Sequence, residues 1–151
     1  MEPLISIRIH DHHRSFRPGQ ELTFAYQIDA VEASEIQAVE ASVLWHSEGK
    51  GDEDLAVHFF ERRVPADADD RDLRSQRKLS TKLPNSPLSY AGVSLKIRWC
   101  IRVRVFLRRG REVFFEQTIV LGDVPAAAPV EDNEVEESET SGETGPTAEA
   151  K

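Results

Sequence analysis

Residues 93–107 have the sequence VSLKIRWCIRVRVFL, in which every odd position holds Val, Leu, Ile or Trp. Most even positions hold polar or basic side chains. Because side chains of a β-strand point alternately to the two faces of a sheet, this period of two predicts one half-buried strand. A strand of this length usually contains a bend or a bulge, and we expect one here.

Shorter stretches repeat the same alternation and are separated by turn residues. They are residues 5–9, 22–28, 39–46 and 55–62, a strand near Leu79 and Leu83, and residues 112–121. Polar residues 47–52 indicate a hairpin connection, and residues 67–76 hold the one plausible helical turn. The pattern predicts an all-β, antiparallel, immunoglobulin-like β-sandwich of about seven strands.

We predict that a three-residue turn, 109–111, joins the long strand to the last one. This register sets apolar residues opposite each other, for example Trp99 opposite Leu121. A two-residue turn would instead move charges to the buried face. On the other face, the predicted register sets Arg104 opposite Glu116.

The chain has 151 residues with 19 basic and 27 acidic side chains, which suits one domain. The single cysteine excludes an internal disulfide bond. The sequence contains no run of 18 apolar residues, so it predicts no membrane-spanning helix. Its start, Met1-Glu2-Pro3, lacks the basic residues with which a signal peptide begins. We therefore expect a cytoplasmic protein.

The charge is unevenly distributed along the chain. Residues 123–151 hold nine acids against Lys151 and contain no aromatic, Leu, Ile or Met residue. They cannot bury enough apolar area to become ordered, so we expect a β-sandwich domain at 1–122 and a disordered acidic tail at 123–151. Whether the tail is regulatory or only solubilising stays open. Residues 73–122 carry eleven basic and two acidic side chains, so a local cationic surface is still expected.

Two short stretches resemble motifs of the arrestin-like superfamily, which includes arrestins, their trafficking relatives, the small retromer subunit and bacterial sporulation-control proteins. One is the Pro-Gly turn in FRPGQ (16–20), and the other is LPNSPLSYAG (83–92) followed by KIRW (96–99). The motif residues are Phe16, Pro18, Gly19, Leu83, Pro84, Pro87, Ser89, Tyr90, Gly92 and Trp99.

The resemblance implies a single arrestin-like lobe with a binding role. Pro18 and Gly19 suit a sharp turn, and Pro84 and Pro87 must end a strand because proline cannot donate a ladder hydrogen bond. The chain departs from the trafficking relatives in having no Pro-Pro-x-Tyr motif. The implied function therefore leaves the partner open.

Catalytic and metal sites find little support in the sequence. His10, His12 and His13 form the one histidine cluster, and a metal-dependent β-fold enzyme using His10, His12 and either His46 or His58 is the alternative function. Solvated loop histidines are favoured, so we predict no metal and no cofactor. The acidic residues 67–72 fail the EF-hand pattern, and Cys100 has no catalytic partner nearby in sequence. We expect no enzymatic activity.

Basic side chains on the even face of residues 93–107, together with the turn after them, form the predicted partner- or anion-binding site, which we call the basic stripe. It comprises Lys96, Arg98, Arg102, Arg104, Arg108, Arg109 and Arg111. Glu116 and Glu112 are expected to neutralise Arg104 and Arg108, whereas the first three have no partner evident in the sequence.

The predicted function is that of a non-enzymatic adaptor that binds a protein partner, acidic where it meets the basic stripe, through a sandwich face, an edge strand or the stripe itself. The acidic tail is expected to fold back on the stripe and compete with such a ligand. Nucleic acid is disfavoured by the polyanionic tail and by the burial of Trp99. Peripheral membrane association and the oligomeric state stay open.

Overall fold

The computed structural model describes residues 2–49 and 53–122, and in these residues it has nine strands in two sheets. The strands are β1 (Leu4–Ile9), β2 (Ser15–Phe16), β3 (Glu21–Asp29), β4 (Ile36–Gly49), β5 (Leu55–Arg63), β6 (Arg77–Lys82), β7 (Tyr90–Ala91), β8 (Leu95–Leu107) and β9 (Glu112–Leu121). Seven of them are long, as predicted, and β2 and β7 have two residues each. The predicted tail lies outside the described residues.

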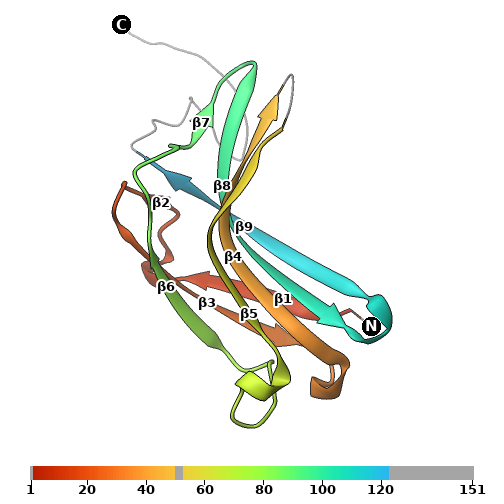
Figure 1. The fold of residues 1–151 in the computed structure, drawn as a ribbon. Coiled ribbons are helices and arrows are strands. Elements are labelled where there is room, and N and C mark those ends of the chain that lie inside the picture. The colour runs from red at the N-terminus through yellow and green to blue at the C-terminus, as the bar shows by residue number, and fades with distance from the viewer. Residues whose placement is uncertain (1, 50–52, 123–151) are drawn as a thin grey trace, which may run out of the picture.

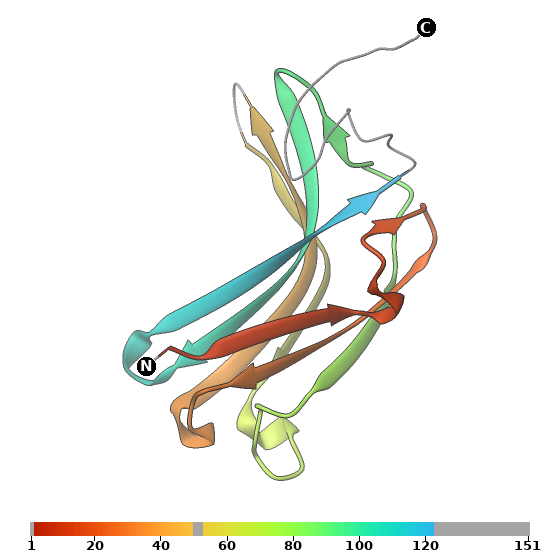
Figure 2. The ribbon, with the colours of Figure 1, turned by 180° about the vertical axis from the view of Figure 1, so that it is seen from behind.

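The two sheets face each other as the layers of a sandwich (Figures 1 and 2). The smaller has the order β1-β3-β6, and the larger has the order β2-β9-β8-β4-β5, with β7 paired to β8. The long strands β4, β5 and β8 extend past the smaller sheet at one end (Figure 1). In residues 2–49 and 53–122 there is no helix long and apolar enough to cross a membrane.

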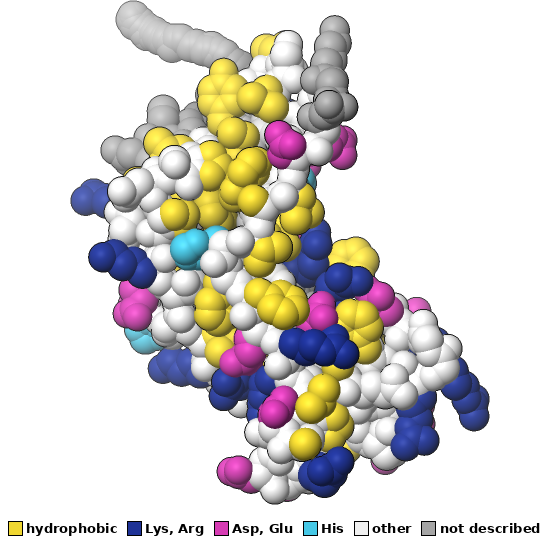
Figure 3. Space-filling view, in the orientation of Figure 1, with side chains coloured by type: hydrophobic (Ala, Val, Ile, Leu, Met, Phe, Trp, Pro, Cys, Tyr) yellow, Lys and Arg dark blue, Asp and Glu magenta, His cyan; other side chains and the backbone are white. Residues whose placement is uncertain are grey.

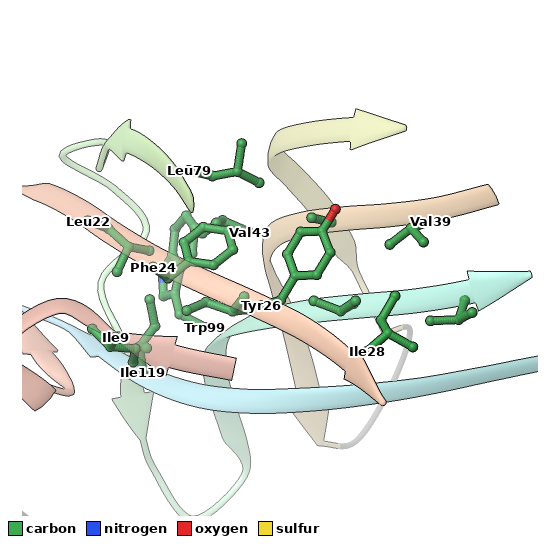
Figure 4. Packing of buried hydrophobic residues seen from close by; sticks show 14 of the residues in the cluster. Ile9, Leu22, Phe24, Tyr26, Ile28, Val39, Val43, Leu79, Trp99 and Ile119 are labelled. Carbon is green, nitrogen blue, oxygen red and sulfur yellow. The ribbon is translucent and has the colours of Figure 1, made fainter. Parts of the chain in front are cut away.

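The core lies between the layers and is filled from both sheets. Strand β3 contributes Leu22, Phe24, Tyr26 and Ile28, each at most 2% exposed, and these side chains face Trp99 and its neighbours on β8 (Figure 4). Because side chains alternate along β3 and β8, each strand points one apolar face into the core between the two sheets.

Strand β8 confirms the predicted faces over most of its length. Its odd positions from Trp99 to Leu107 are buried, whereas 46% of the Arg98 side chain is exposed. The prediction is wrong at the start, because the strand begins at Leu95 and both Val93 and Leu95 are exposed. This end of β8 extends beyond the smaller sheet, so no second layer covers it.

A bend or a bulge was expected in this strand, and no bulge occurs within β8. Its pairing with β4 is unbroken from Leu95 to Phe106, and the register shifts lie at residues 36–38 of β4 and between β4 and β5 at Val43/Leu44. The helical turn expected at 67–76 is also displaced, since the described segment has a 3-10 turn at Pro65–Asp67.

The predicted β8–β9 register is wrong by two residues, although its faces are correct. Trp99 lies opposite Ile119 rather than Leu121, and Arg102 rather than Arg104 lies opposite Glu116. The turn has three residues, 108–110, and Leu107 N–H donates to Arg111 O at 2.8 Å. The shift places Gly110, at φ 72°, last in the turn, where a left-handed conformation closes a three-residue hairpin.

Candidate partner-binding surface

The outer face of the larger sheet carries the strand part of the basic stripe. Lys96, Arg98, Arg102 and Arg104 occupy even positions of β8, and Trp99 and its odd neighbours occupy the core side. The sequence pattern therefore placed these four basic side chains on the correct face. Their predicted anion-binding role stays a prediction.

Carboxylates on the neighbouring strands meet three of these cations. Arg98 pairs with Glu48, Arg102 with Glu116, and Arg104 with Glu112 and Glu40. The distances from Arg98 Nε to Glu48 Oε2 and from Arg104 Nε to Glu112 Oε2 are 3.2 and 2.7 Å. Arg102, for which the sequence showed no partner, gains one because of the two-residue change of register. The outer face therefore presents alternating charges rather than a cationic ridge.

Aromatic and aliphatic side chains lie among these ion pairs. The guanidinium carbons of Arg62 and Arg104 lie 5.3 and 5.2 Å from the centre of the Phe106 ring. Four exposed apolar residues share this outer face through their pairing with β4 and β8: Leu55, Val57, Phe60 and Phe114. Their side chains are 49–60% exposed. We call these four residues the apolar outer patch, in which Phe114 on β9 is separated from the other three on β5 by strands β8 and β4.

Hydrophobic groups lie side by side with both signs of charge on this part of the surface (Figure 3). Enrichment in aromatic residues and arginine is typical of protein–protein interfaces. Sequence reasoning did not single out Leu55, Val57 and Phe60, because the bulge in β5 changes which of its residues point outward.

Two other members of the basic stripe lie at the end of the sandwich. Arg108 and Arg109 line an open cleft of about 950 Å³ together with Arg71, a residue that the sequence did not single out. Arg108 Nε donates to Ser34 O at 2.8 Å, and Glu35 is the carboxylate in the lining. In the part of the chain that the structure describes, neither Arg71 nor Arg109 forms an ion pair.

Lys96 and Arg111 stand at opposite ends of the predicted stripe. Both side chains are exposed, and within residues 2–49 and 53–122 neither has an ion-pair partner. Arg111 also lies outside the lining of the end cleft. Four of the seven predicted basic residues thus lie on the sheet face, two line the end cleft, and Arg111 lies apart from both.

The histidines do not come together in one place. His10 and His12 lie in an exposed 3-10 turn, whereas His58 Nε2 lies 2.8 Å from Lys82 O and its ring packs edge-on against Trp99. Among the described residues, no group of three His, Cys, Asp or Glu side chains is placed to hold a metal ion. The alternative of a metal-dependent enzyme receives no support from this geometry.

Cys100 points to the outer face but is buried among its neighbours, with 3% of the residue exposed. Burial, followed by the nearby Glu116 carboxylate, raises the pKa of the Cys100 thiol to about 11, and the positive charge of Arg102 opposes this effect. The thiol is therefore protonated near neutral pH, which is the opposite of what a nucleophile requires.

Comparisons with known proteins agree with the two-layer architecture. No family model matches the chain, and no curated protein matches its sequence. Among solved structures, the sporulation control protein Spo0M from Bacillus subtilis superimposes with a TM-score of 0.56 at 10% sequence identity. The fold is an arrestin-like β-sandwich.

The alignment with Spo0M covers 81% of this chain and 50% of that protein, so the chain spans half the length of this neighbour. The two segments that resemble arrestin-like motifs contribute buried residues, a turn and a hydrogen bond to the sandwich. Phe16 is buried in β2, Gly19 has φ 82° in the turn before β3, and Trp99 Nε1 donates to Pro87 O at 2.8 Å. Motif residues 83–92 thus run from the end of β6 to β7 and pass Trp99 of β8.

Proposed function

We propose that this arrestin-like sandwich is a non-enzymatic, cytoplasmic adaptor that docks a protein partner on the outer face of its larger sheet. The observation that carries the proposal is the apolar outer patch beside the Arg–Glu pairs of β8. The aromatic and aliphatic groups supply apolar area that a partner can bury. The paired charges orient the partner and add little to the overall affinity. A regulatory or adaptor role also suits the fold shared with Spo0M.

The partner chemistry follows from the charges on this face. Because Arg98, Arg102 and Arg104 already have carboxylate partners, a polyanion such as nucleic acid would have to displace them. A protein surface with apolar groups and charges of both signs fits better. The end cleft with Arg71 and Arg109 supplies a second contact, suited to an acidic side chain of the same partner.

The acidic residues of 123–151 are proposed to weaken this second contact by competing for the arginines of the cleft. Such competition is electrostatic, and salt therefore reduces it. Replacing Glu136, Glu137 and Glu139 with Gln is expected to strengthen capture of an acidic partner at low salt and to have little effect at high salt. A salt-independent difference would contradict this role.

Variants of the outer face test the main proposal. Phe60→Asp combined with Phe114→Asp places two charges in the apolar outer patch, and Leu4→Asp is the matched control because Leu4 is 66% exposed on the other sheet. Affinity purification from the native host with quantitative mass spectrometry should show proteins that the control retains and the double variant loses. Equal recovery by the two variants, with unchanged circular dichroism, would exclude the outer face.

A further inference from the structure

A second apolar surface lies at the end where β4, β7 and β8 extend beyond the smaller sheet. Tyr90 is paired with Ile97, and Trp45 with Trp99, so their side chains continue the core-facing side of the larger sheet. We call the surface the apolar shelf, and it comprises Trp45, Leu88, Tyr90, Leu95 and Ile97.

The apolar shelf is exposed to a degree that is unusual for such side chains. Tyr90 is 55% exposed, and Leu88 and Leu95 are each 44% exposed. Hydrophobic side chains gather over the ends of β7 and β8 in Figure 3. The charged neighbours Lys96 and Arg98 point to the opposite face of the sheet. A contiguous apolar area of this kind usually has an occupant.

The described chain ends beside the shelf. Leu121 N–H donates to Ser89 Oγ and Ser89 N–H donates to Leu121 O, both at 2.8 Å. A Cβ on Gly122 would lie 3.3 Å from Leu88 Cδ2. These contacts hold the last described residue against one edge of the shelf.

The sequence that follows is suited to an apolar surface. Residues 124–130 are VPAAAPV and carry no charge, and acidic residues resume at Glu131. Seven extended residues reach up to about 24 Å, whereas three adjacent strands span about 10 Å, so the segment is long enough to cross the shelf. Tethering gives the segment an effective concentration in the millimolar range, so weak contacts are sufficient.

We propose that residues 124–130 pack against the apolar shelf of their own chain. Pro125 and Pro129 restrict the segment to extended conformations and so lower the entropy cost of binding, and proline-rich segments commonly bind aromatic side chains such as Tyr90. The acidic residues that follow begin at Glu131 and are not held by this contact. The surface is separate from the apolar outer patch, which lies on the other face of the larger sheet.

Disulfide trapping in the full chain tests the contact. Leu95→Cys is combined with Ala127→Cys in a Cys100→Ser background, and the control pairs Ala127→Cys with Lys96→Cys, which is next to Leu95 but on the opposite face of β8. The first pair should form an intramolecular disulfide about tenfold faster than the control, as expected for a tethered contact. Equal rates would overturn the proposal. A disulfide between two chains would assign the shelf to a second copy and would also overturn it.

Hydrogen exchange provides a test without new cysteines. Val124→Asp with Val130→Asp places two charges in the segment, and Thr140→Asp with Thr147→Asp places the same charges further along the chain. Exchange of residues 88–97 should accelerate about tenfold in the first variant, as expected if a tethered cover is lost. Unchanged exchange in both variants would overturn the proposal. No partner is present in either experiment, so their failure leaves the proposed outer-face function standing.

Discussion

The backbone N–H of Gly19 donates a hydrogen bond of 3.1 Å to the carbonyl oxygen of Leu83, and the N–H of Leu83 donates one of 2.9 Å to Gln20 O. These bonds join two segments that are more than sixty residues apart and that both resemble arrestin-like motifs. The Pro-Gly turn therefore holds the start of β3 against the end of β6, and its conformation affects the pairing of the smaller sheet.

Gly19→Ala is expected to destabilise the fold by about 1–2 kcal/mol, because φ of 82° is a left-handed conformation that alanine adopts with strain. Space is not the cause, since a Cβ there would meet only Lys82 Cε at 4.0 Å. Asn tolerates this conformation better, so Gly19→Asn should lose less stability. Urea unfolding measures both variants, and equal losses for Ala and Asn would contradict the conformational explanation.

Trp99→Phe is expected to cost about 1–3 kcal/mol, because it leaves the Pro87 carbonyl without its indole donor. Trp45→Phe is the matched control. Trp45 lies directly opposite Trp99 on β4, is half-buried, and within the described residues its indole makes no hydrogen bond. Thermal or urea unfolding should show a clearly larger loss for Trp99. A similar loss at both positions would mean that ring volume, rather than the hydrogen bond, determines stability.

A double-mutant cycle on Arg102 and Glu116 should give a coupling energy of about 1 kcal/mol at low salt. The cycle on Arg98 and Glu48 should give less than about half of that value, because those side chains are 46% and 43% exposed against 24% and 32% for the first pair. The expected difference reflects weaker solvent screening of the half-buried pair. Equal coupling energies, measured by urea unfolding, would contradict this explanation.

The Cys100 thiol should make the fold sensitive to alkaline pH. Its pKa is raised in the folded state to about 11, so the protonated thiol favours the fold. This contribution is fully present below the unfolded pKa near 9 and is lost as pH rises through 11. Between pH 8 and 11, wild type should therefore lose about 2 kcal/mol more unfolding free energy than Cys100→Ala.

Alkylation offers an independent check on the same residue. At pH 8 the native thiol should react with iodoacetamide at least about tenfold more slowly than the thiol in urea, because it is both buried and protonated. Rapid alkylation of the native protein, or parallel pH dependences of wild type and Cys100→Ala, would show that the thiol is accessible in the fold.

Alternation along the chain was sufficient to predict the class of fold and the faces of its principal strands. Period two in residues 99–107 and 22–28 correctly predicted which side chains meet in the core, because a strand must send neighbouring residues to opposite sides. The Pro18-Gly19 turn was also predictable, since local backbone preferences determine it. These features depend on residues that are close together in sequence.

Contacts between distant segments determined three other features. These are the register of β8 and β9, the carboxylate partners of the arginines, and the place where the smaller sheet ends. A shift of two residues keeps every side chain on its face, so the apolar pattern alone does not distinguish the two registers. That shift gave Arg102 the carboxylate of Glu116. Arg71 and Arg109 line the same cleft because two loops that are distant in sequence lie at the same end of the sandwich. Leu95 is exposed because the smaller sheet ends before it. Local sequence determines neither of these arrangements.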